Sequence, residues 1–314
     1  MLFFINFFCI FISLHVYKNI WIYLKINKTP TGAGIIFLIA LLINIYLNDE
    51  SYSSELKIAF SLISVLTLIY YIDDLMSLSV AARIIIQILL GIIITTTFFS
   101  NLFIVNSYLF IIILACILIL SLLLTNTINF YDGADLNIVF FGVLNFLILS
   151  FVFSLDKNIQ ILIHLSLVFF IAFSFINYKA NSLYFGDAGS FFLAGLFLIF
   201  IALAAVMQNL KIYYLLTTLC LPILDVIYVI LYRLIRKEPL HTRHYYQIYQ
   251  LAQRTQRKWL YLLIQPVNTV FSLLSIFFLC SLGLNETVSI ITGCFLISII
   301  FYFSLRFFLM NAKK

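Results

Sequence analysis

Charged residues are scarce in this sequence. Only 10% of its 314 residues are Asp, Glu, Lys or Arg, whereas a soluble domain carries about 25% because its surface must be solvated. The 12 acidic and 18 basic residues cannot cover a globule of this size. The composition therefore excludes a soluble enzyme, and the 64% of hydrophobic residues excludes a disordered chain.

Residues that interrupt or cross-link secondary structure are also few. Four Pro and ten Gly leave long apolar runs, which is typical of a helical membrane protein. The cysteines form no CxxC pair and have no spacing of metal ligands, and the scarcity of charged residues also excludes a secreted protein built on disulfides. We expect them to be small buried hydrophobes: Cys9, Cys116, Cys220, Cys280 and Cys294.

Long apolar stretches occupy most of the chain, and about 20 apolar residues suffice to cross a bilayer. The first stretch lacks a preceding basic region and a following small-residue cleavage site, so we interpret it as a retained span. The short loops leave no room for a soluble domain, and we predict one transmembrane domain over residues 1–314. About eleven spans are predicted: 1–17, 32–48, 57–72, 82–100, 104–124, 138–154, 159–177, 190–206, 211–232, 259–281 and 286–308.

The basic residues are divided unequally between the two sides of the membrane. An odd number of spans places the termini on opposite sides. With the N-terminus outside, all but three of the 18 Lys and Arg residues fall on the other side, the exceptions being Lys57, Lys157 and Lys211. Because Lys and Arg are retained on the cytoplasmic side, the sequence predicts an all-α integral membrane protein with its N-terminus outside and its C-terminus in the cytoplasm.

Six Asp residues lie at or near the cytoplasmic ends of the predicted spans, flanked by apolar residues. A carboxylate close to hydrocarbon costs several kcal/mol unless it is paired, bound to a metal or facing water. Their gathering at one face predicts a functional site there. The six are Asp73, Asp74, Asp132, Asp135, Asp187 and Asp225.

The third predicted span ends in YYIDDL, which contains the adjacent acids Asp73 and Asp74. Two adjacent carboxylates repel each other and oppose the dipole of a helix C-terminus. A metal-bound or proton-accepting pair is therefore favoured over a solvated helix end. Arg83 follows on the next span, where it is either a phosphate clamp or an anchor at the cytoplasmic face.

Two glycine-containing segments are candidates for phosphate binding. In TPTGAG, which follows Lys28, the residues Thr31 and Gly32 let backbone N–H groups approach a phosphate, although this pattern alone favours an ordinary turn. In YFGDAGS, Asp187 lies between two glycines at the start of a span, where a ligand can approach closely. Capping of the helix is the common alternative. Asn181, slightly upstream, is a further candidate for substrate binding.

The fifth predicted span runs into NTINFYDGADLN, in which amides and carboxylates recur every three residues. Asn126, Asn129, Asp132 and Asp135 therefore follow one helical face. These side chains offer oxygen ligands for Mg²⁺ and hydrogen-bond partners for a nucleobase. We favour this interpretation over a stripe that seals helix contacts, because two of the four residues are carboxylates.

The longest cytoplasmic loop contains HTRHYYQ, with His241 and His244 beside Arg243. No Cys or further acid is near enough in sequence to complete a zinc site. Contact with a phosphate or a leaving group is therefore favoured. Arg254, Arg257 and Lys258, further along this loop, indicate a segment that lies on anionic headgroups.

The chain resembles the polyprenyl-phosphate N-acetylhexosamine-1-phosphate transferase family in five segments that occur in the same order. They are TPTGAG, YYIDDL with Arg83 and Gln87 behind it, NTINFYDGAD, YFGDAGS, and PILD followed by HTRHYYQ. The segments stretch from about residue 28 to about residue 255. The resemblance implies a polytopic helical bundle with its active site at the cytoplasmic end. Its last loop looks closest to the branch that starts the O-antigen of lipopolysaccharide or a capsule, in cell wall biogenesis.

The resemblance implies a phosphoglycosyl transferase that moves an N-acetylhexosamine 1-phosphate from a UDP-sugar to undecaprenyl phosphate and releases UMP. The implied cofactor is Mg²⁺, with Mn²⁺ as the alternative cation. In the family, the Asp matching Asp187 ligates the metal, helped in some members by the Asn matching Asn129. Asp73 and Asp74 match the pair that is proposed to prepare the lipid phosphate as nucleophile.

Further roles follow from the resemblance, together with two departures from it. The position matching Asp135 contacts uracil, and those matching His241 and His244 face the diphosphate. Ala33 replaces the middle Gly of the family's Gly-rich turn, and Leu136 replaces the Gly that usually follows the uracil-contacting position.

The expected partners are UDP-N-acetylhexosamine, undecaprenyl phosphate and membrane lipids, with no nucleic acid, and a homodimer is left open. The expected location is the inner (cytoplasmic) membrane. A transporter or flippase of lipid-linked sugars is the alternative, but transporters place ionisable residues near the bilayer midplane, and the span centres here are nearly free of charge. The intact acidic and histidine segments argue against an inactive relative.

Overall fold

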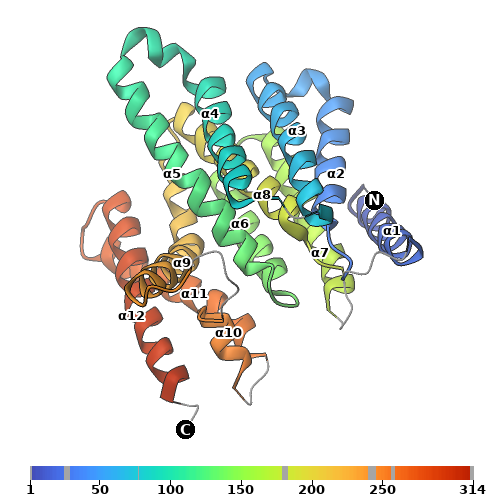
Figure 1. Cartoon of the computed structure of the whole chain (residues 1–314). Coiled ribbons are helices and arrows are strands. Elements are labelled where there is room, and N and C mark those ends of the chain that lie inside the picture. The colour runs from blue at the N-terminus through green and yellow to red at the C-terminus, as the bar shows by residue number, and fades with distance from the viewer. Residues whose placement is uncertain are drawn as a thin grey trace. The chain divides into compact units, whose positions relative to one another are not determined.

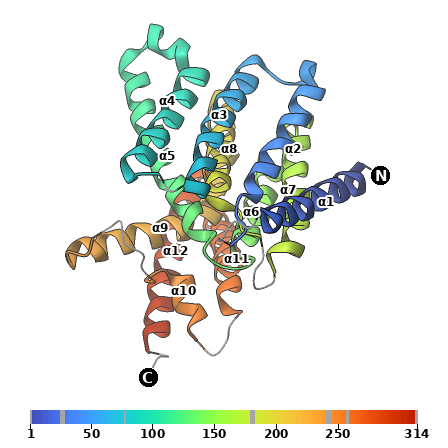
Figure 2. The same ribbon diagram turned by 45° about the vertical axis from the view of Figure 1, so that its right-hand side comes forward.

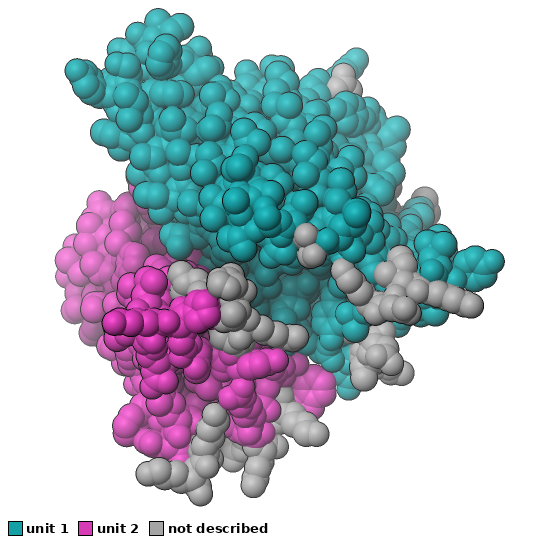
Figure 3. All heavy atoms as spheres, in the orientation of Figure 1, with its two compact units in different colours: residues 1–209 teal, residues 210–314 magenta. Residues whose placement is uncertain are grey.

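A computed structural model describes residues 2–24, 29–76, 78–178, 183–239, 245–255 and 259–311. All regular secondary structure in these residues is helical, which confirms the predicted all-α fold (Figure 1). The chain divides into two compact units, residues 1–209 and residues 210–314 (Figure 3). The prediction of one domain over the whole chain stays a prediction.

Unit 1, residues 1–209, contains eight α-helices among its described residues, and the short 3₁₀-helix η1 (Asp49–Ser51) joins the second to the third. The helices are α1 (Leu2–Tyr23), α2 (Ala33–Leu47), α3 (Ser54–Met76), α4 (Val80–Val105), α5 (Ser107–Tyr131), α6 (Asn137–Val152), α7 (Lys157–Asn177) and α8 (Gly186–Val206). Unit 2, residues 210–314, contains the 3₁₀-helix η2 (Leu210–Leu215) and the helices α9 (Leu216–Ile235), α10 (Ile248–Gln253), α11 (Leu260–Ser281) and α12 (Glu286–Asn311).

Each of the eleven predicted spans coincides with a described helix. Nine helices of the described chain, with η2 and α9 counted as one, are long and apolar enough to cross a membrane. The other two, α2 and α6, have 15 and 16 residues, which at 1.5 Å per residue reach about 22–24 Å. The chain is therefore a multi-pass membrane protein. The six-residue helix α10 has no counterpart in the prediction, because it is too short for a span.

Several helices extend further than their apolar runs predict, and three of them do so beside the candidate site residues. Helix α3 continues to Met76 instead of residue 72, α5 continues to Tyr131 instead of residue 124, and α8 begins at Gly186 instead of residue 190. Helical hydrogen bonds join backbone groups, so a helix continues through polar residues when their side chains find partners. Polar residues expected at span ends therefore lie on helices.

Helix α8 lies at the centre of unit 1. It contacts α2, α3, α4 and α5, and nearly all of its side chains are buried; Figure 2 shows it beside α3. An aromatic core surrounds its first turns. Phe37 of α2 stacks on Phe169 of α7 at 4.6 Å between ring centroids and meets Phe192 of α8 at 5.4 Å. Phe185, directly before α8, lies 5.7 Å from Phe170. This packing holds the start of α8 in place.

At one end of unit 1, the end of α2, the segment that follows it and the start of α7 are joined by hydrogen bonds. Asn158 at the start of α7 donates to the carbonyl of Ser51 at 2.7 Å, and the Tyr52 hydroxyl donates to Asn44 at the end of α2 at 2.8 Å. The starts of α2 and α8 and the ends of α3 and α5 therefore share the opposite end of the unit. Which end faces the cytoplasm stays a prediction.

Candidate active site

The segments TPTGAG and YFGDAGS run side by side, joined by backbone hydrogen bonds. The N–H of Tyr184 donates to the carbonyl of Pro30 at 2.8 Å, and the N–H of Ala33 donates back to Tyr184 at 3.1 Å. The N–H of Gly34 donates to the carbonyl of Phe185 at 3.0 Å. The start of α2 thus forms one wall of the loop that precedes Asp187.

Glycine is required at the crossing of these segments. Gly32 and Gly186 have φ angles of 97° and 87°, which other residues adopt only at a cost. A Cβ on Gly186 would lie 2.7 Å from the N atom of Gly32 and 2.8 Å from Oδ2 of Asp74. The Tyr17 hydroxyl donates to the carbonyl of Thr31 at 2.7 Å. Close packing therefore accounts for the two glycines. The phosphate contact predicted for Thr31 and Gly32 stays a prediction.

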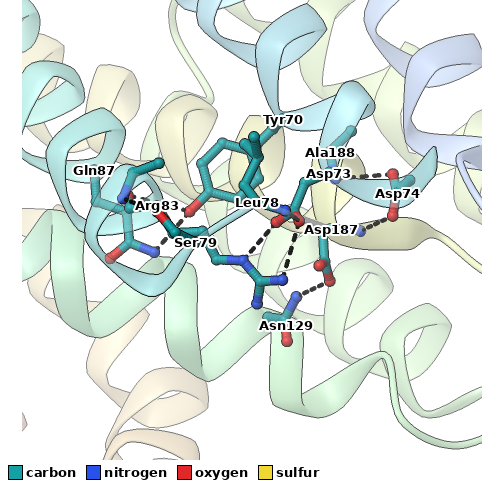
Figure 4. A network of polar contacts seen from close by, with 11 residues as sticks. Tyr70, Asp73, Asp74, Leu78, Ser79, Arg83, Gln87, Asn129, Asp187 and Ala188 are labelled. Carbon is teal, nitrogen blue, oxygen red and sulfur yellow. Dashed lines mark hydrogen bonds and ion pairs between the residues drawn. The ribbon is translucent and has the colours of Figure 1, made fainter. Parts of the chain in front are cut away.

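The side chains of Asp73 and Asp74 point to different elements (Figure 4). Asp73 forms a two-pronged ion pair with Arg83 of α4, with Nε 2.6 Å from Oδ2 and Nη2 3.0 Å from Oδ1. The N–H of Leu78 also donates to Oδ1, at 2.5 Å. The Asp73 side chain is fully buried, whereas that of Arg83 is 38% exposed. The guanidinium group is therefore fixed on one side and open on the other.

Asp74 and Asp132 accept hydrogen bonds from the backbone at the start of α8. Asp74 accepts the N–H of Asp187 at 2.8 Å and that of Ala188 at 3.2 Å. Asp132, in the turn after α5, accepts the N–H groups of residues 185 and 186 at 3.2 and 2.8 Å. The first N–H groups of a helix have no partner within the helix, and a negative charge there is favourable for the helix dipole. Asp74 and Asp132 supply hydrogen-bond partners for these N–H groups and, when ionised, the negative charge that the helix dipole favours.

Acidic side chains are concentrated around the turn that follows α5. Burial raises the pKa of the Asp132 carboxyl to about 8, against the lowering effect of the N–H groups of Gly186 and Phe185. The charges of Asp187 and Asp74 raise this pKa as well. Acids from α3, from this turn and from α8 are therefore close enough to interact.

Asp187 differs from the three other acids in its partner. In the described part of the chain, its carboxylate accepts one hydrogen bond, from the side-chain amide of Asn129 on α5 (Figure 4). Among the described residues no backbone N–H bonds to it and no cation forms an ion pair with it, although the charge of Arg83 acts on it from a distance. Its oxygens and the Asn129 carbonyl are hard donors of the kind that Mg²⁺ prefers.

The described residues contain no group of three or more His, Cys, Asp or Glu side chains arranged to hold a metal ion. A cation at Asp187 and Asn129 would therefore complete its shell with water and substrate oxygens. This is usual for Mg²⁺ in phosphate-transferring sites, where one or two protein carboxylates act together with the substrate's phosphates. The donor chemistry fits the ion, and its presence stays a prediction.

Asn126 lies one turn before Asn129 but takes part in a neighbouring network. It is exposed, and its amide donates to Oε1 of Gln87 at 3.3 Å. Gln87 in turn donates to the hydroxyl of Tyr70 at 2.9 Å, and the Tyr70 ring stacks on Phe191 at 4.5 Å. These contacts tie α3, α4, α5 and α8 together beside the acids.

Asp135 lies at the rim of the cluster, where the hydroxyl of Tyr184 donates to it at 3.4 Å. The next residue, Leu136, has a φ of 60°, and its N–H donates to Oδ1 of Asn177 at 2.6 Å. Asn177 also donates to the carbonyl of Leu183 at 2.9 Å, so it connects the two loops of the site.

Sequence reasoning missed Asn177 and Tyr17 as residues that shape the site. The signal for Asn177 was present, because it is the amide that ends an apolar span. No signal marked Tyr17, since tyrosine is common at membrane interfaces. The remaining predicted residues lie outside the described chain: Lys28, Asn181, His241, Arg243 and His244.

The sequence matches one family model over residues 56–208, which is described as glycosyl transferase family 4. No curated protein matches the chain. The matched residues run from α3 to the end of α8, contain all four clustered acids, and end where unit 1 ends. The match supports a transferase that adds a sugar phosphate to a polyprenyl phosphate. The acidic cluster thus lies within a region that is similar to glycosyl transferase family 4.

Proposed function

We propose that the protein transfers an N-acetylhexosamine 1-phosphate from a UDP-sugar to undecaprenyl phosphate and releases UMP. The observation that supports this most is the pair of Asp187 and Asn129, two hard oxygen donors placed beside Arg83 inside the family match. The site lies where apolar helices end, so a lipid phosphate and a soluble nucleotide can both reach it. The excess of Lys and Arg in loops on the same predicted side supports the cytoplasmic face of an inner membrane.

Mg²⁺, with Mn²⁺ as an alternative, fits the donors that Asp187 and Asn129 provide. When bound, such an ion neutralises the diphosphate and makes UMP a better leaving group. Asn129 also holds the Asp187 carboxylate through its amide, which limits the directions in which that carboxylate can point.

Arg83 is the described cation best placed to bind a phosphate. Asp73 holds two of its nitrogen atoms, and the rest of the guanidinium group is accessible. In the reaction, an oxygen of the lipid phosphate forms a bond to the β-phosphorus of the UDP-sugar. The bond from that phosphorus to the bridging oxygen breaks, and UMP leaves with the electron pair. A fixed guanidinium beside these phosphates lowers the repulsion between two anionic reactants.

The test is release of UMP by membranes that contain the protein. Undecaprenyl phosphate and Mg²⁺ are supplied with a panel of UDP-N-acetylhexosamines, and the lipid product is identified by mass spectrometry. We expect one or a few of these sugars to react and to form a sugar-diphosphate lipid of the kind that starts an O-antigen or capsule chain. Asp187→Asn should abolish release while the protein still inserts.

Asp156→Asn is the matched control. Asp156 also accepts a backbone N–H at a helix start, that of Ile159 at 2.9 Å, but it lies at the other end of unit 1. Its variant should retain activity. If no UDP-sugar yields UMP, the proposal is wrong, and movement of a lipid-linked sugar across vesicles without UMP release would favour the transporter.

A further inference from the structure

The four acids of the site have three different kinds of partner. Asp73 is neutralised by a guanidinium, and Asp187 has the amide of Asn129. Asp74 and Asp132 accept only backbone N–H groups among the hydrogen bonds of the described chain, and each uses both of its oxygen atoms. Although the four side chains are chemically alike, their different partners indicate that they have different roles.

Helix α8 has no cap of its own. A helix is usually capped by the side chain of the residue just before it, but that residue here is Phe185, which has no side-chain oxygen and a helical backbone conformation. The N–H groups of residues 185–188 point instead to Asp74 on α3 and to Asp132 after α5. Two carboxylates from distant parts of the sequence thus replace a local cap for four consecutive donors.

These bonds fix the residue proposed to ligate the cation. Asp187 follows Gly186, whose left-handed backbone turns the chain into the helix, so the direction of the Asp187 side chain depends on how this turn is held. Asn129 and Asp132 lie on one short stretch of chain, three residues apart. The bond from Asn129 to Asp187 and the bonds from the start of α8 to Asp132 therefore join the same two elements.

We infer that Asp74 and Asp132 are positioning residues that hold Asp187 against Asn129 in the orientation that binds the cation. This inference rests on the proposed function, and it gives Asp74 a role other than the proton acceptor that the family resemblance implies. Asp74 acts on the reaction through Asp187.

The first readout does not depend on activity. Hydrogen exchange is measured for the segment 183–190 in the purified, metal-free protein. Asp74→Asn and Asp132→Asn each keep the side-chain shape but replace one acceptor oxygen by an NH₂ group, so one N–H of the turn loses its partner. We expect exchange in this segment to increase in both variants and to remain as in the wild type in Asp156→Asn.

The second readout is Mn²⁺ binding in the presence of UDP, followed by electron paramagnetic resonance. Loss of a group that orients a metal ligand typically weakens affinity 10- to 100-fold, and we expect a decrease of this size in both variants. Raised Mg²⁺ should then recover most of the kcat for UMP release. A proton acceptor would behave differently, because its loss lowers kcat at every Mg²⁺ concentration and removes the acidic limb of the pH–rate profile.

The outcomes separate this inference from the proposed function. Unchanged exchange at 183–190, or unchanged Mn²⁺ affinity in both variants, overturns the positioning role, as does a kcat that high Mg²⁺ does not restore. If the wild type binds no Mn²⁺ and releases no UMP, the proposed function fails, and the role toward the cation fails with it, even if exchange shows that the carboxylates hold the turn.

Discussion

Gly34 and Gly189 are in backbone contact where α2 meets α8. A Cβ on Gly34 would lie 2.0 Å from the Cα of Gly189, and a Cβ on Gly189 would lie 2.9 Å from the Cα of Gly34. Small residues let helices in a membrane approach this closely. Gly189 is two residues after Asp187, so the closeness of the two helices also determines where the metal-binding candidate lies.

We expect Gly34→Ala to destabilise unit 1 and to lower UMP release. Overpacking costs about 1–3 kcal/mol, and this clash involves backbone atoms that cannot rotate away, so the loss should lie at the upper end. Gly195→Ala on α8 is the control, because the nearest atom to its Cβ is Cγ2 of Ile63 at 3.0 Å, on a side chain that can adjust. Thermal unfolding in detergent measures both, and equal stabilities would contradict the packing argument.

Because Asp73 and Arg83 form an ion pair, the effects of substituting them on the free energy of unfolding should not be additive. Arg83→Gln leaves a buried carboxylate without its cation, and since Arg83 is partly exposed we expect a loss of about 2 kcal/mol, below the 3–5 kcal/mol of a fully buried pair. Adding Asp73→Asn should recover most of this loss. Neither the single nor the double variant should regain full UMP release, because both lack the guanidinium group proposed to bind phosphate. Thermal unfolding of the two single variants and the double variant measures this coupling. If the double variant loses as much stability as the two single variants together, the ion pair does not contribute.

Asn129 should matter for the cation more than for the fold. Asn129→Ala removes the amide that holds Asp187 and one candidate oxygen ligand, so we expect Mn²⁺ affinity in the presence of UDP to fall about 10- to 100-fold with little change in thermal unfolding. Asn158→Ala, at the other end of the unit, removes an exposed amide that donates to Ser51 and serves as control. Equal Mn²⁺ affinities for the two variants would contradict the role of Asn129.

Leu136 has a left-handed backbone conformation that favours glycine, at the position where the family usually has Gly. The left-handed region costs a residue with a side chain about 1–2 kcal/mol, while glycine loses more entropy on folding. Leu136→Gly should therefore raise the stability of unit 1, by no more than about 1 kcal/mol. Leu155→Gly is the control, since Leu155 lies in a turn without a positive φ and should gain nothing. A loss in Leu136→Gly would show that its side-chain contacts matter more.

Much of the fold follows from the sequence because hydrocarbon imposes a simple pattern. Apolar runs of sufficient length predicted all the long helices, with errors of a few residues at their ends. The largest single error lies beside the site, where α5 extends seven residues past its predicted end at residue 124. Hydropathy measures burial in lipid, whereas the helix continues as long as its polar side chains have partners in the protein.

The acids of the site were also identifiable, but not what each of them does. Asp74 bonds to a residue 113 positions away, and Asn129 bonds to one 58 positions away. Such partners depend on how the helices pack, which local spacing does not encode. The sequence placed Asp73 and Asp74 in the site, and the structure adds that they bond to two different elements, Asp73 to Arg83 on α4 and Asp74 to the start of α8. Resemblance to a family identified the residues without giving their hydrogen bonds.

Unit 2 contains a buried charge pair. One partner is Asp225 on α9, which the sequence grouped with the acids of the predicted site, and the other is Arg306, which falls on the predicted cytoplasmic side. Arg306 is only 6% exposed, and its Nη1 lies 4.0 Å from Oδ1 of Asp225. Asp225 accepts the Tyr302 hydroxyl at 2.9 Å and the N–H of Ile248, at the start of α10, at 3.0 Å. Arg306 donates to the carbonyl of Tyr246 at 3.0 Å. The two charged residues thus fix the chain as it enters α10.

We expect Arg306→Met to loosen this part of unit 2. The substitution keeps an apolar stem of similar length but leaves the Asp225 carboxylate buried without its cation, which costs about 3–5 kcal/mol. It also removes the hydrogen bond from Arg306 to the carbonyl of Tyr246. Hydrogen exchange in residues 245–255 should therefore rise well above that of the wild type. Arg236→Met is the control, because Arg236 is exposed and its guanidinium stacks on Tyr232 at 4.5 Å. If both variants exchange alike, the pair does not anchor α10, and the segment is held by its packing against α11 and α12 alone.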